Sequence, residues 1–420
     1  MKLSVPYGAS VQEVDLTGVD VEVGRSEGPG EVDERAALES AFSSPVDSPS
    51  LSEFLAGADD AVVIVNDAKR ATPTARILEF MRSELDAVPD ITFIIATGTH
   101  RESTPEEIER IIGAAADREG ARVVVHDGRD AEAMRCLGRT PRGTEVCFNR
   151  IVTDASRIVV VGSVEPHYFA GFTGGRKAFL PGVAGYETVC RNHSHTLLPG
   201  THLMSLEGNP VHEDMMDALA LMGDRPIFSV MVVMDSEHRI CGAFAGDIDG
   251  SFRAAVERSR DVYSVDVSGK ADIVLAVALT PADSDLYQAH KAIESSKLAL
   301  VEGGVLILVA ECREGFGNDV FVDQLRSARS LPDVARNMKS KPGGEYVIGD
   351  HKSVKLAELV MESEVWMVTD LPAETIADMF FRPFGSVQEA LDAALELKGG
   401  DARVLCLMDA ANTVPRLPQG

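Results

Sequence analysis

Residues 59 to 67 read DDAVVIVND, a short apolar run with acidic residues at both ends. Such a run is typical of a strand buried on both faces of a parallel sheet. Four similar runs follow, in ITFIIATG (91–98), ARVVVHD (121–127), RIVVVGS (157–163) and FSVMVVMD (228–235). Helical stretches separate them, and in one of these Thr104, Pro105 and Glu107 form a capping box. We therefore predict an α/β fold with a mostly parallel sheet.

A second series of apolar runs occupies the last third of the chain. It comprises DIVLAVA (272–278), GVLILVAEC (304–312), EVWMVTD (364–370) and ARVLCLMD (402–409), again with amphipathic stretches between the runs. The sequence thus predicts two domains, 1–268 and 269–420, each with a mostly parallel sheet flanked by helices. The first fifty residues are ambiguous, apart from a predicted helix in ERAALESAF.

The composition limits the partners that this chain can have. Its 66 acidic and 40 basic side chains give a formal charge of -26, which repels nucleic acid and anionic membrane surfaces. The N-terminus lacks a secretory signal pattern and no apolar run is long enough to cross a membrane, so we expect a cytoplasmic protein. Six scattered cysteines without a CxxC pair predict reduced thiols, mostly packed in cores.

Polar residues follow three of the predicted strands, where ligands bind in open parallel sheets. They are Asn66, Asp67 and Arg70 after the first run, Thr97, Gly98 and His100 after the second, and Gly162, Glu165 and His167 after the fourth. Each has a simpler explanation alone: Asp67 as a helix cap, Arg70 as a solvated charge, His100 as a loop histidine. Together they indicate a binding site at one edge of the sheet.

The segment GFTGGRKAFLPG (171–182) is rich in glycine, but it is neither a Walker A loop nor a GxGxxG turn. Gly171 and the four residues after it are followed by Arg176 rather than by Gly-Lys, and no Ser or Thr follows Lys177. The loop can still bring backbone N–H groups close to a phosphate. Lys177 is then a phosphate counter-charge or a nucleophile, and the alternative is an ordinary surface lysine.

His193, in RNHSHTL, is a candidate metal ligand, because neutral imidazole suits late first-row metals. His195 points elsewhere if this segment is helical, and we assign neither His202 nor His212 to the site. A zinc hydrolase needs three such ligands with a carboxylate base, and that spacing is absent.

Taken together, these motifs resemble those of the nickel-pincer-nucleotide lactate racemase family, the LarA-like 2-hydroxyacid racemases and epimerases. The motifs are Asp67 with Arg70, ATGTHR (96–101), EPHYFAGFTGGRKAFLPG (165–182), the NHS segment at His193 and YQAHK (287–291). The resemblance implies an N-terminal cofactor-binding catalytic domain, a C-terminal substrate and closure domain, and an active site in the cleft between them. It also implies cofactor-synthesis proteins as partners for maturation.

The resemblance assigns a role to each site residue. Lys177 tethers the cofactor covalently, a pyridinium-3,5-bisthiocarboxylic acid mononucleotide derivative that carries nickel. His193 ligates the metal, and Gly174 and Gly175 belong to the cofactor loop. His100 and His167 are the acid/base pair. Substrate is oriented by Arg70 and Lys291, with Asp67, Tyr287 and Gln288 around it.

The implied reaction is racemisation or epimerisation of a 2-hydroxy acid by proton-coupled hydride transfer. Because the α-hydrogen is very weakly acidic, taking it as hydride while an imidazole takes the hydroxyl proton avoids a carbanion and gives a planar 2-keto acid. Two classes of protein remain as alternatives: a nucleotide- or phosphate-binding, kinase-like protein that uses the glycine loop, and a zinc-dependent hydrolase built on His193, His195 and His202.

The segment DHKSVKLAEL (350–359) departs from the pattern of lactate-specific members, for which we expect a tryptophan in this region. The only tryptophan, Trp366, falls in a predicted strand and is expected in a core. His351 and Lys352 add cationic groups, which favours malate or another acid with a polar distal group over lactate. The alternative is that both cap a helix facing water, and for His290 a solvated helix face is expected.

Overall fold

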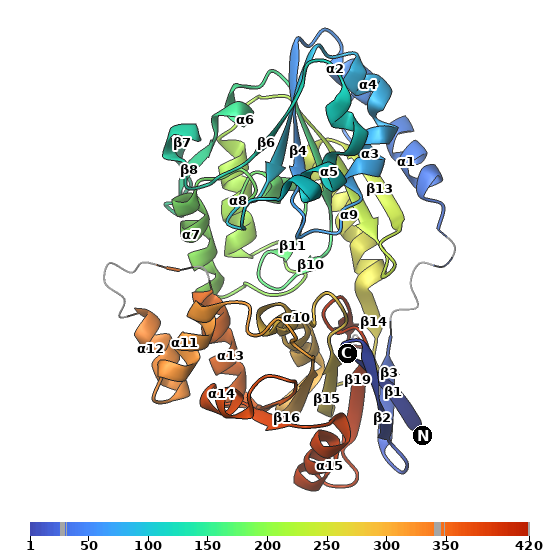
Figure 1. The fold of residues 1–420 in the computed structure, drawn as a ribbon, viewed down its shortest axis with the longest axis vertical. Coiled ribbons are helices and arrows are strands. Elements are labelled where there is room, and N and C mark those ends of the chain that lie inside the picture. Colours follow the sequence, from blue (N-terminus) through green and yellow to red (C-terminus); the bar gives the residue numbers. More distant parts are fainter. Residues whose placement is uncertain (26–29, 31, 340–345, 348, 419–420) are drawn as a thin grey trace. The chain divides into compact units, whose positions relative to one another are not determined.

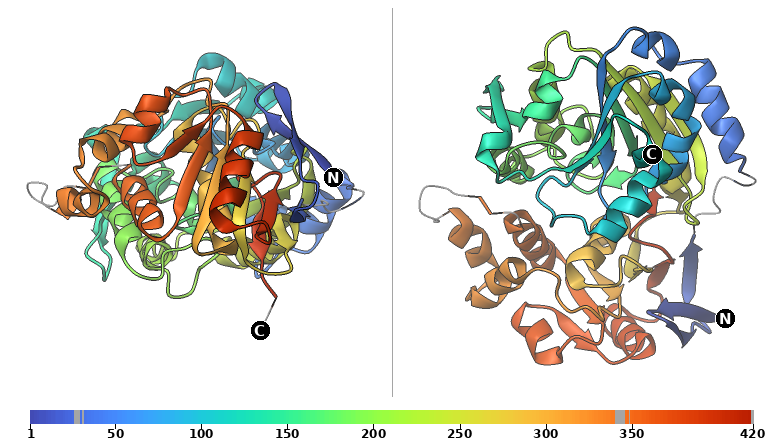
Figure 2. Two further views of the ribbon diagram at one scale, coloured as in Figure 1. Left: turned by 90° about the horizontal axis from the view of Figure 1, so that it is seen from below. Right: turned by 45° about the horizontal axis from the view of Figure 1, so that its top comes forward.

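The computed structural model describes residues 1–25, 30, 32–339, 346–347 and 349–418. The chain forms two compact units. The continuous unit is Gly28–Val262, and the discontinuous unit combines Met1–Glu27 with Tyr263–Gly420. Each unit is a mostly parallel sheet flanked by helices, which confirms the predicted α/β class (Figures 1 and 2).

The sheet of the continuous unit has the strand order β13-β12-β9-β4-β5-β6. All neighbours in it are parallel except β13, which runs antiparallel to β12. The strands are β4 (Asp60–Asn66), β5 (Asp90–Ala96), β6 (Ala121–Val125), β9 (Ile158–Ser163), β12 (Ile227–Met234) and β13 (Ile240–Gly246). The five apolar runs of the first series are therefore strands, as predicted.

Helices cover this sheet because side chains of each buried strand alternate between its faces. On β4, Val63 and Val65 pack in one apolar cluster with side chains of α1 to α5, so Val62 and Ile64 face the other side. The helices are α1 (Glu34–Ser43), α2 (Leu51–Leu55), α3 (Thr74–Phe80), α4 (Arg82–Asp86), α5 (Pro105–Ile112), α6 (Arg150–Asp154), α7 (Tyr186–Ser194), α8 (Pro210–Ala220) and α9 (Ile248–Tyr263). The predicted capping box of α5 is present, with Thr104 and Glu107 bonded reciprocally.

The sheet of the discontinuous unit has the order β18-β17-β16-β15-β19-β3, with every neighbour parallel. Its strands are β3 (Asp20–Gly24), β15 (Ala271–Val277), β16 (Leu300–Val309), β17 (Glu364–Val368), β18 (Arg382–Phe384) and β19 (Arg403–Leu407). Its helices are α10 (Leu286–Ser296), α11 (Asp319–Ser327), α12 (Leu331–Lys339), α13 (Asp350–Glu362), α14 (Ala373–Asp378) and α15 (Val387–Lys398). The strands β14 (Ser264–Asp266) and β20 (Val414–Arg416) pair with each other.

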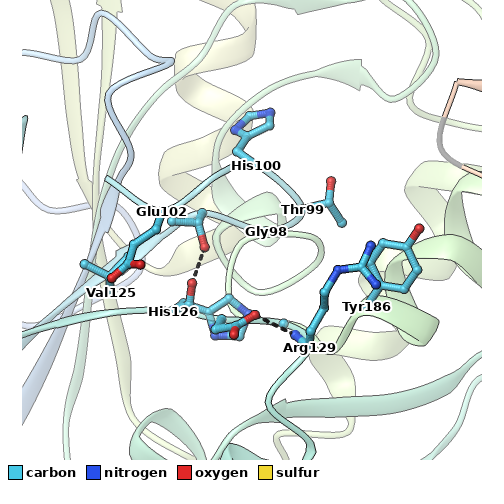
Figure 3. Close-up of a pocket in the computed structure, with 11 residues that line it drawn as sticks. Gly98, Thr99, His100, Glu102, Val125, His126, Arg129 and Tyr186 are labelled. Atoms are coloured by element: carbon cyan, nitrogen blue, oxygen red, sulfur yellow. Dashed lines mark hydrogen bonds between the residues drawn. The ribbon is translucent and has the colours of Figure 1, made fainter. Parts of the chain in front are cut away.

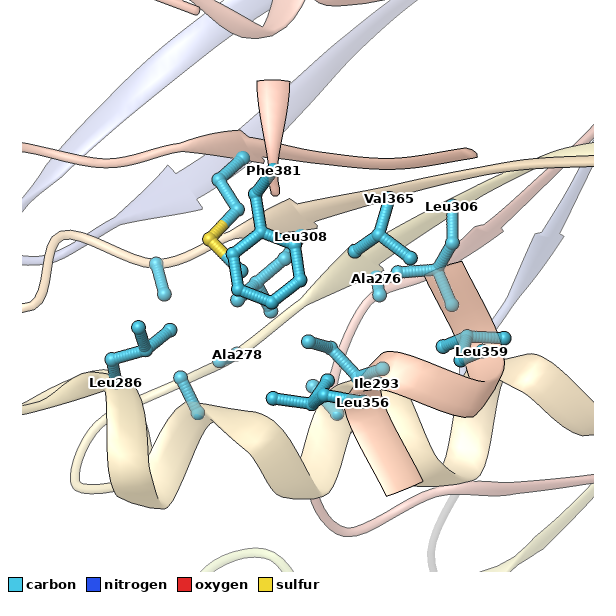
Figure 4. Close-up of a cluster of buried hydrophobic side chains, with 14 of the residues drawn as sticks. Ala276, Ala278, Leu286, Ile293, Leu306, Leu308, Leu356, Leu359, Val365 and Phe381 are labelled. Carbon is cyan, nitrogen blue, oxygen red and sulfur yellow. The ribbon is translucent and has the colours of Figure 1, made fainter. Parts of the chain in front are cut away.

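Both faces of this sheet are covered. Ala276 and Leu306 contribute to a cluster with Leu286 and Ile293 of α10 and with α13 (Figure 4). Leu275, from the same strand as Ala276, faces a second cluster that contains α15 and the fully buried Trp366. The expectation that Trp366 is a core residue is confirmed.

The compact units differ from the predicted ranges 1–268 and 269–420 in the first 27 residues and in residues 263–268, which all belong with the C-terminal part of the chain. Strand β3 pairs with β19 at the edge of the C-terminal sheet. The hairpin of β1 (Lys2–Tyr7) and β2 (Ser10–Asp15) places Val5 and Val14 in the same core as Trp366. Hydrogen bonding and apolar burial therefore attach the N-terminal segment to the C-terminal part of the chain.

The prediction that all six cysteines are reduced is wrong for one pair. Cys136 and Cys147 face each other across the antiparallel hairpin of β7 (Met134–Arg139) and β8 (Glu145–Asn149), and they form a disulfide. The spacing of the two along the chain did not reveal that a hairpin brings them together. Cys190, Cys312 and Cys406 are buried and, within the described residues, belong to no disulfide. Within the described residues, no helix is both long and apolar enough to cross a membrane.

Candidate functional site

The predicted polar edge lies where the continuous sheet reverses its strand order. Strand β4 has β5 on one side and β9 on the other, and the chain visits β9 only after β6. Crevices at such points, beyond the carboxyl ends of the strands, are where open α/β sheets bind ligands. The loops after β4, β5 and β9 carry Asp67, His100 and His167. The structure thus brings three predicted site residues to adjacent strand ends.

Asp67 and His100 form the closest contact among them. The Nδ1 atom of His100 lies 2.7 Å from Oδ2 of Asp67, whose side chain is only 6% exposed. A proton on Nδ1 is donated to this carboxylate, which leaves Nε2 of the more exposed imidazole able to accept or donate a proton. Arg70 lies 4.0 Å from the carboxylate of Glu165, on the loop after β9.

A chain of hydrogen bonds links the loops after β4 and β9. The amide of Asn66 donates to Oγ1 of Thr72 over 2.7 Å, and Thr72 donates to Oγ of Ser163 over 2.9 Å. Ser163 donates in turn to Glu165 over 3.1 Å. Sequence reasoning missed Thr72 and Ser163, because their roles depend on two loops that are distant in the sequence.

Phe169 is a second residue that sequence reasoning missed. Its ring is 4.5 Å from the imidazole of His167 and 5.0 Å from that of His193, between ring centroids. The Nζ atom of Lys177 lies 5.4 Å from the same ring. Three predicted site residues therefore surround one buried aromatic side chain. Its position in EPHYFAG, directly after His167 and Tyr168, was the available signal.

Lys177 lies in a short 3-10 helix, Gly175–Ala178, of the glycine-rich loop. Its pKa is held well below the usual value, first by burial and then by the positive charges of Arg70 and Arg176. Lowering the pKa of a lysine increases the fraction present as the neutral amine, which is the nucleophilic form. The alternative of an ordinary surface lysine is wrong.

Arg176 holds this glycine-rich loop in place. Its guanidinium is almost fully buried, donates to the carbonyl of Ala170 over 2.7 Å and to that of Gly174 over 3.2 Å, and stacks on Phe252 of α9. Burial lowers its pKa to about 9. The two carbonyl bonds hold the loop on both sides of Phe172 and Thr173.

Gly174 and Gly175 allow this loop to pack closely. Both have positive φ, +83° and +53°. A Cβ atom on Gly174 would lie 2.7 Å from Val164, and one on Gly175 would lie 2.8 Å from Phe252. The two glycines are thus required by backbone conformation and packing, and their contact with a cofactor stays a prediction.

His193 is in the last turn of α7 and only 8% exposed. Burial, and after it the neighbouring Lys177 ammonium, lowers its pKa to about 3. The imidazole is therefore neutral at physiological pH, which is the form that ligates metals. His195 faces buried Asp214 across 3.6 Å, whereas His202 is exposed. The three histidines of the zinc alternative do not share one environment, and the described residues hold no group of three or more His, Cys, Asp or Glu side chains suited to a metal ion.

The other four predicted residues lie in the discontinuous unit. Tyr287, Gln288 and Lys291 occupy consecutive turns of α10, and Lys352 is in the first turn of α13. The ammonium of Lys352 donates to the carbonyl of Tyr287 and lies 3.3 Å from the centroid of its ring. Burial and then the charge of Lys291 hold the pKa of Lys352 well below its usual value.

Two expectations about exposure are wrong. His351 and Lys352 are 1% and 2% exposed, so they do not cap a helix facing water. His290, expected on a solvated helix face, is fully buried. Helix α13 packs against α11 and α12 as well as against β17, so little of its surface faces solvent.

Two protein families match this chain. The Lactate racemase N-terminal domain matches residues 7–203, and the Lactate racemase C-terminal domain matches residues 267–414. The lactate racemase of Thermoanaerobacterium thermosaccharolyticum is 28% identical over 424 residues, covering 99% of both chains. That of Lactiplantibacillus plantarum is 28% identical over 390 residues, covering 91% of both chains.

Solved structures show the same relationship. The lactate racemase apoprotein from Thermoanaerobacterium thermosaccharolyticum has a TM-score of 0.91 and 29% identity, covering 99% of this chain and 100% of that chain. A Thermotoga maritima protein with 17% identity and a TM-score of 0.73 shares the fold, over 93% of this chain and 100% of its own.

The fold and these matches define an α/β isomerase of the racemase class. More closely, the chain belongs to the lactate racemase family, as both of its domain matches and its structural neighbour show. The kinase-like and zinc-hydrolase alternatives are therefore replaced by a racemase.

Proposed function

We propose that this protein is a nickel-dependent 2-hydroxyacid racemase or epimerase that acts by proton-coupled hydride transfer through a 2-keto acid. One observation carries the proposal: the amine of Lys177, whose pKa is lowered, and the neutral buried imidazole of His193 lie around the same ring of Phe169. The first is suited to a covalent tether and the second to a metal ligand.

These residues fit a nickel-pincer nucleotide. Lys177 would hold it covalently and His193 would ligate its nickel, while the loop at Gly174 and Gly175 would support it. When bound, the group supplies reversible hydride acceptance from the substrate's α-carbon. Proteins that synthesise the cofactor are then partners in maturation.

His100 and His167 would accept and return the hydroxyl proton of the two substrate enantiomers. Asp67 fixes the ring of His100 through Nδ1, so Nε2 is the atom that exchanges the proton. His167 is on a separate element, the short β10–β11 pair, and its ring packs against Phe169. The two enantiomers present their hydroxyl groups in different directions, so two imidazoles on different loops can each serve one enantiomer.

Substrate binding would use Arg70, Tyr287, Gln288 and Lys291. Arg70 can pair bidentately with the carboxylate, and Lys291 adds a point charge. Tyr287 and Gln288 stand on the same helix as Lys291. Burial first raises the pKa of Tyr287 to about 12, so its hydroxyl stays protonated and can donate a hydrogen bond.

The metal assignment is tested by nickel content. In protein produced with the cofactor-synthesis proteins, we expect His193→Ala to lower the nickel bound per chain, because one ligand is lost. The measurement is elemental mass spectrometry of purified protein, with His202→Ala as a control on an exposed histidine. Nickel equal to wild type in His193→Ala, or zinc without nickel in the wild type, contradicts the assignment.

The substrate is proposed to be malate or another hydroxy acid with a polar distal group. The side chain of Lys352, which is buried and donates to the carbonyl of Tyr287, would pair with the distal carboxylate. We expect kcat/KM to be higher for D-malate than for D-lactate. Lys352→Met, which preserves volume, should cost malate about 2 kcal/mol and leave lactate nearly unchanged.

The control for this substrate test is Lys270→Ala, at an exposed lysine of the same unit. Activity on single enantiomers is followed by chiral chromatography. A native preference for lactate, or equal losses for the two acids in Lys352→Met, contradicts the proposed substrate.

A further inference from the structure

A pocket of about 280 Å³ opens beyond the carboxyl ends of β5 and β6 (Figure 3). Its polar lining includes Thr99, His100, Glu102, Asp127, Arg129 and Tyr186, all from the continuous unit. His100 belongs both to this pocket and to the pair with Asp67. The pocket therefore adjoins the candidate site, yet none of its other side chains has a role in the proposed reaction.

Backbone contacts fix the walls of the pocket. Gly98 donates to the carbonyl of Gly182 over 3.0 Å, and Tyr186 donates to that of Gly128 over 2.8 Å. A Cβ atom on Gly128 would lie 2.9 Å from the carbonyl oxygen of Ala184. Three segments distant in sequence are thus held in close contact, so the cavity is formed before a ligand enters.

Arg129 is the cation of this pocket. Its guanidinium carbon lies 3.8 Å from the centroid of the Tyr186 ring, alongside which it is stacked in Figure 3. In the part of the chain that the structure describes, Arg129 forms no ion pair with a carboxylate. Stacking fixes the plane of the guanidinium, and the N–H donors of this plane suit a carboxylate or phosphate.

Oxygen acceptors stand opposite this cation. Glu102 and Asp127 contribute carboxylates, and Thr99 contributes a hydroxyl. One oxygen of Asp127 is engaged by the backbone N–H of Arg129 over 2.8 Å. An anion without hydroxyl groups would be repelled by the two carboxylates. A ligand that carries hydroxyl groups beside its anionic group can donate hydrogen bonds to the carboxylates and pair with Arg129.

We propose that this pocket binds a hydroxylated anion, with Arg129 pairing with the anionic group and Glu102 accepting from its hydroxyls. Two sources share this chemistry: the ribose 5-phosphate part of a mononucleotide, and the polyhydroxy chain of a sugar acid. Binding to this pocket is measured without measuring turnover. The identity of the natural ligand rests on the proposed function.

The test is calorimetric titration of the full chain, produced without cofactor, with ribose 5-phosphate, D-gluconate and orthophosphate. We expect Arg129→Gln to weaken the binding of the hydroxylated anions by at least about tenfold. Glu102→Gln should weaken these ligands but not orthophosphate. Arg122→Gln, at the opposite end of β6, is the matched control and should bind as wild type.

Each outcome decides the proposal. Tighter binding of ribose 5-phosphate assigns the pocket to a nucleotide, and tighter binding of gluconate assigns it to the substrate. Absence of binding for both, or unchanged affinity in Arg129→Gln, overturns it. A protein that binds these ligands but racemises no 2-hydroxy acid would instead contradict the proposed function alone.

Discussion

Lys177→Ala is expected to abolish covalent retention of the nucleotide in protein produced with the cofactor-synthesis proteins. The physical reason is the amine of Lys177, whose pKa is lowered by burial and by two neighbouring guanidinium groups, so that more of it is in the nucleophilic neutral form. The tether requires this nucleophile, and alanine offers none. Intact-protein mass spectrometry should show the added mass in wild type and only the mass of the chain in the variant.

The control for this prediction is Lys69→Ala. Lys69 is an exposed lysine on the loop after β4, and its removal should leave the adduct in place. If Lys177→Ala still carries the adduct, another nucleophile forms the tether and the assignment is wrong.

Replacing His100 or His167 by alanine should lower kcat by about 10² to 10⁴-fold while nickel content stays at the wild-type level. Each substitution removes a group that exchanges the hydroxyl proton, and neither removes the metal ligand His193. The measurements are racemisation of single enantiomers and nickel per chain in the same preparations. His202→Ala, at an exposed histidine of the same unit, should keep both values.

This pair of readouts separates proton transfer from metal binding. Loss of nickel in His100→Ala or His167→Ala would show that these residues support the cofactor instead. Normal turnover in both variants would contradict the acid/base assignment.

The sequence predicted the sheets because buried parallel strands are nearly uninterrupted apolar runs. β4, β5, β15 and β16 are recognisable from their own residues, without knowledge of their neighbours. The polar edge followed from the rule that carboxyl ends of parallel strands share one side of a sheet. Local pattern and a general rule were sufficient for both.

What the sequence did not reveal depends on contacts between distant segments. Lys352 and His290 are buried by the elements that pack around them. From the sequence alone, a charged or imidazole side chain is ordinarily expected to face solvent. The contacts of Phe169 with His167 and His193, and the disulfide of Cys136, likewise require tertiary neighbours. Single-residue properties carry no information about such neighbours.

The pairing of β3 with β19 affects how the chain can fold while the ribosome makes it. Residues 20–24 are translated before the continuous unit, but their partner at 403–407 is translated after it. The continuous unit between them is complete much earlier and can fold as synthesis proceeds. Strand β3 therefore has no partner until β19 has been translated, and in that interval its unpaired backbone is exposed to association with other nascent chains.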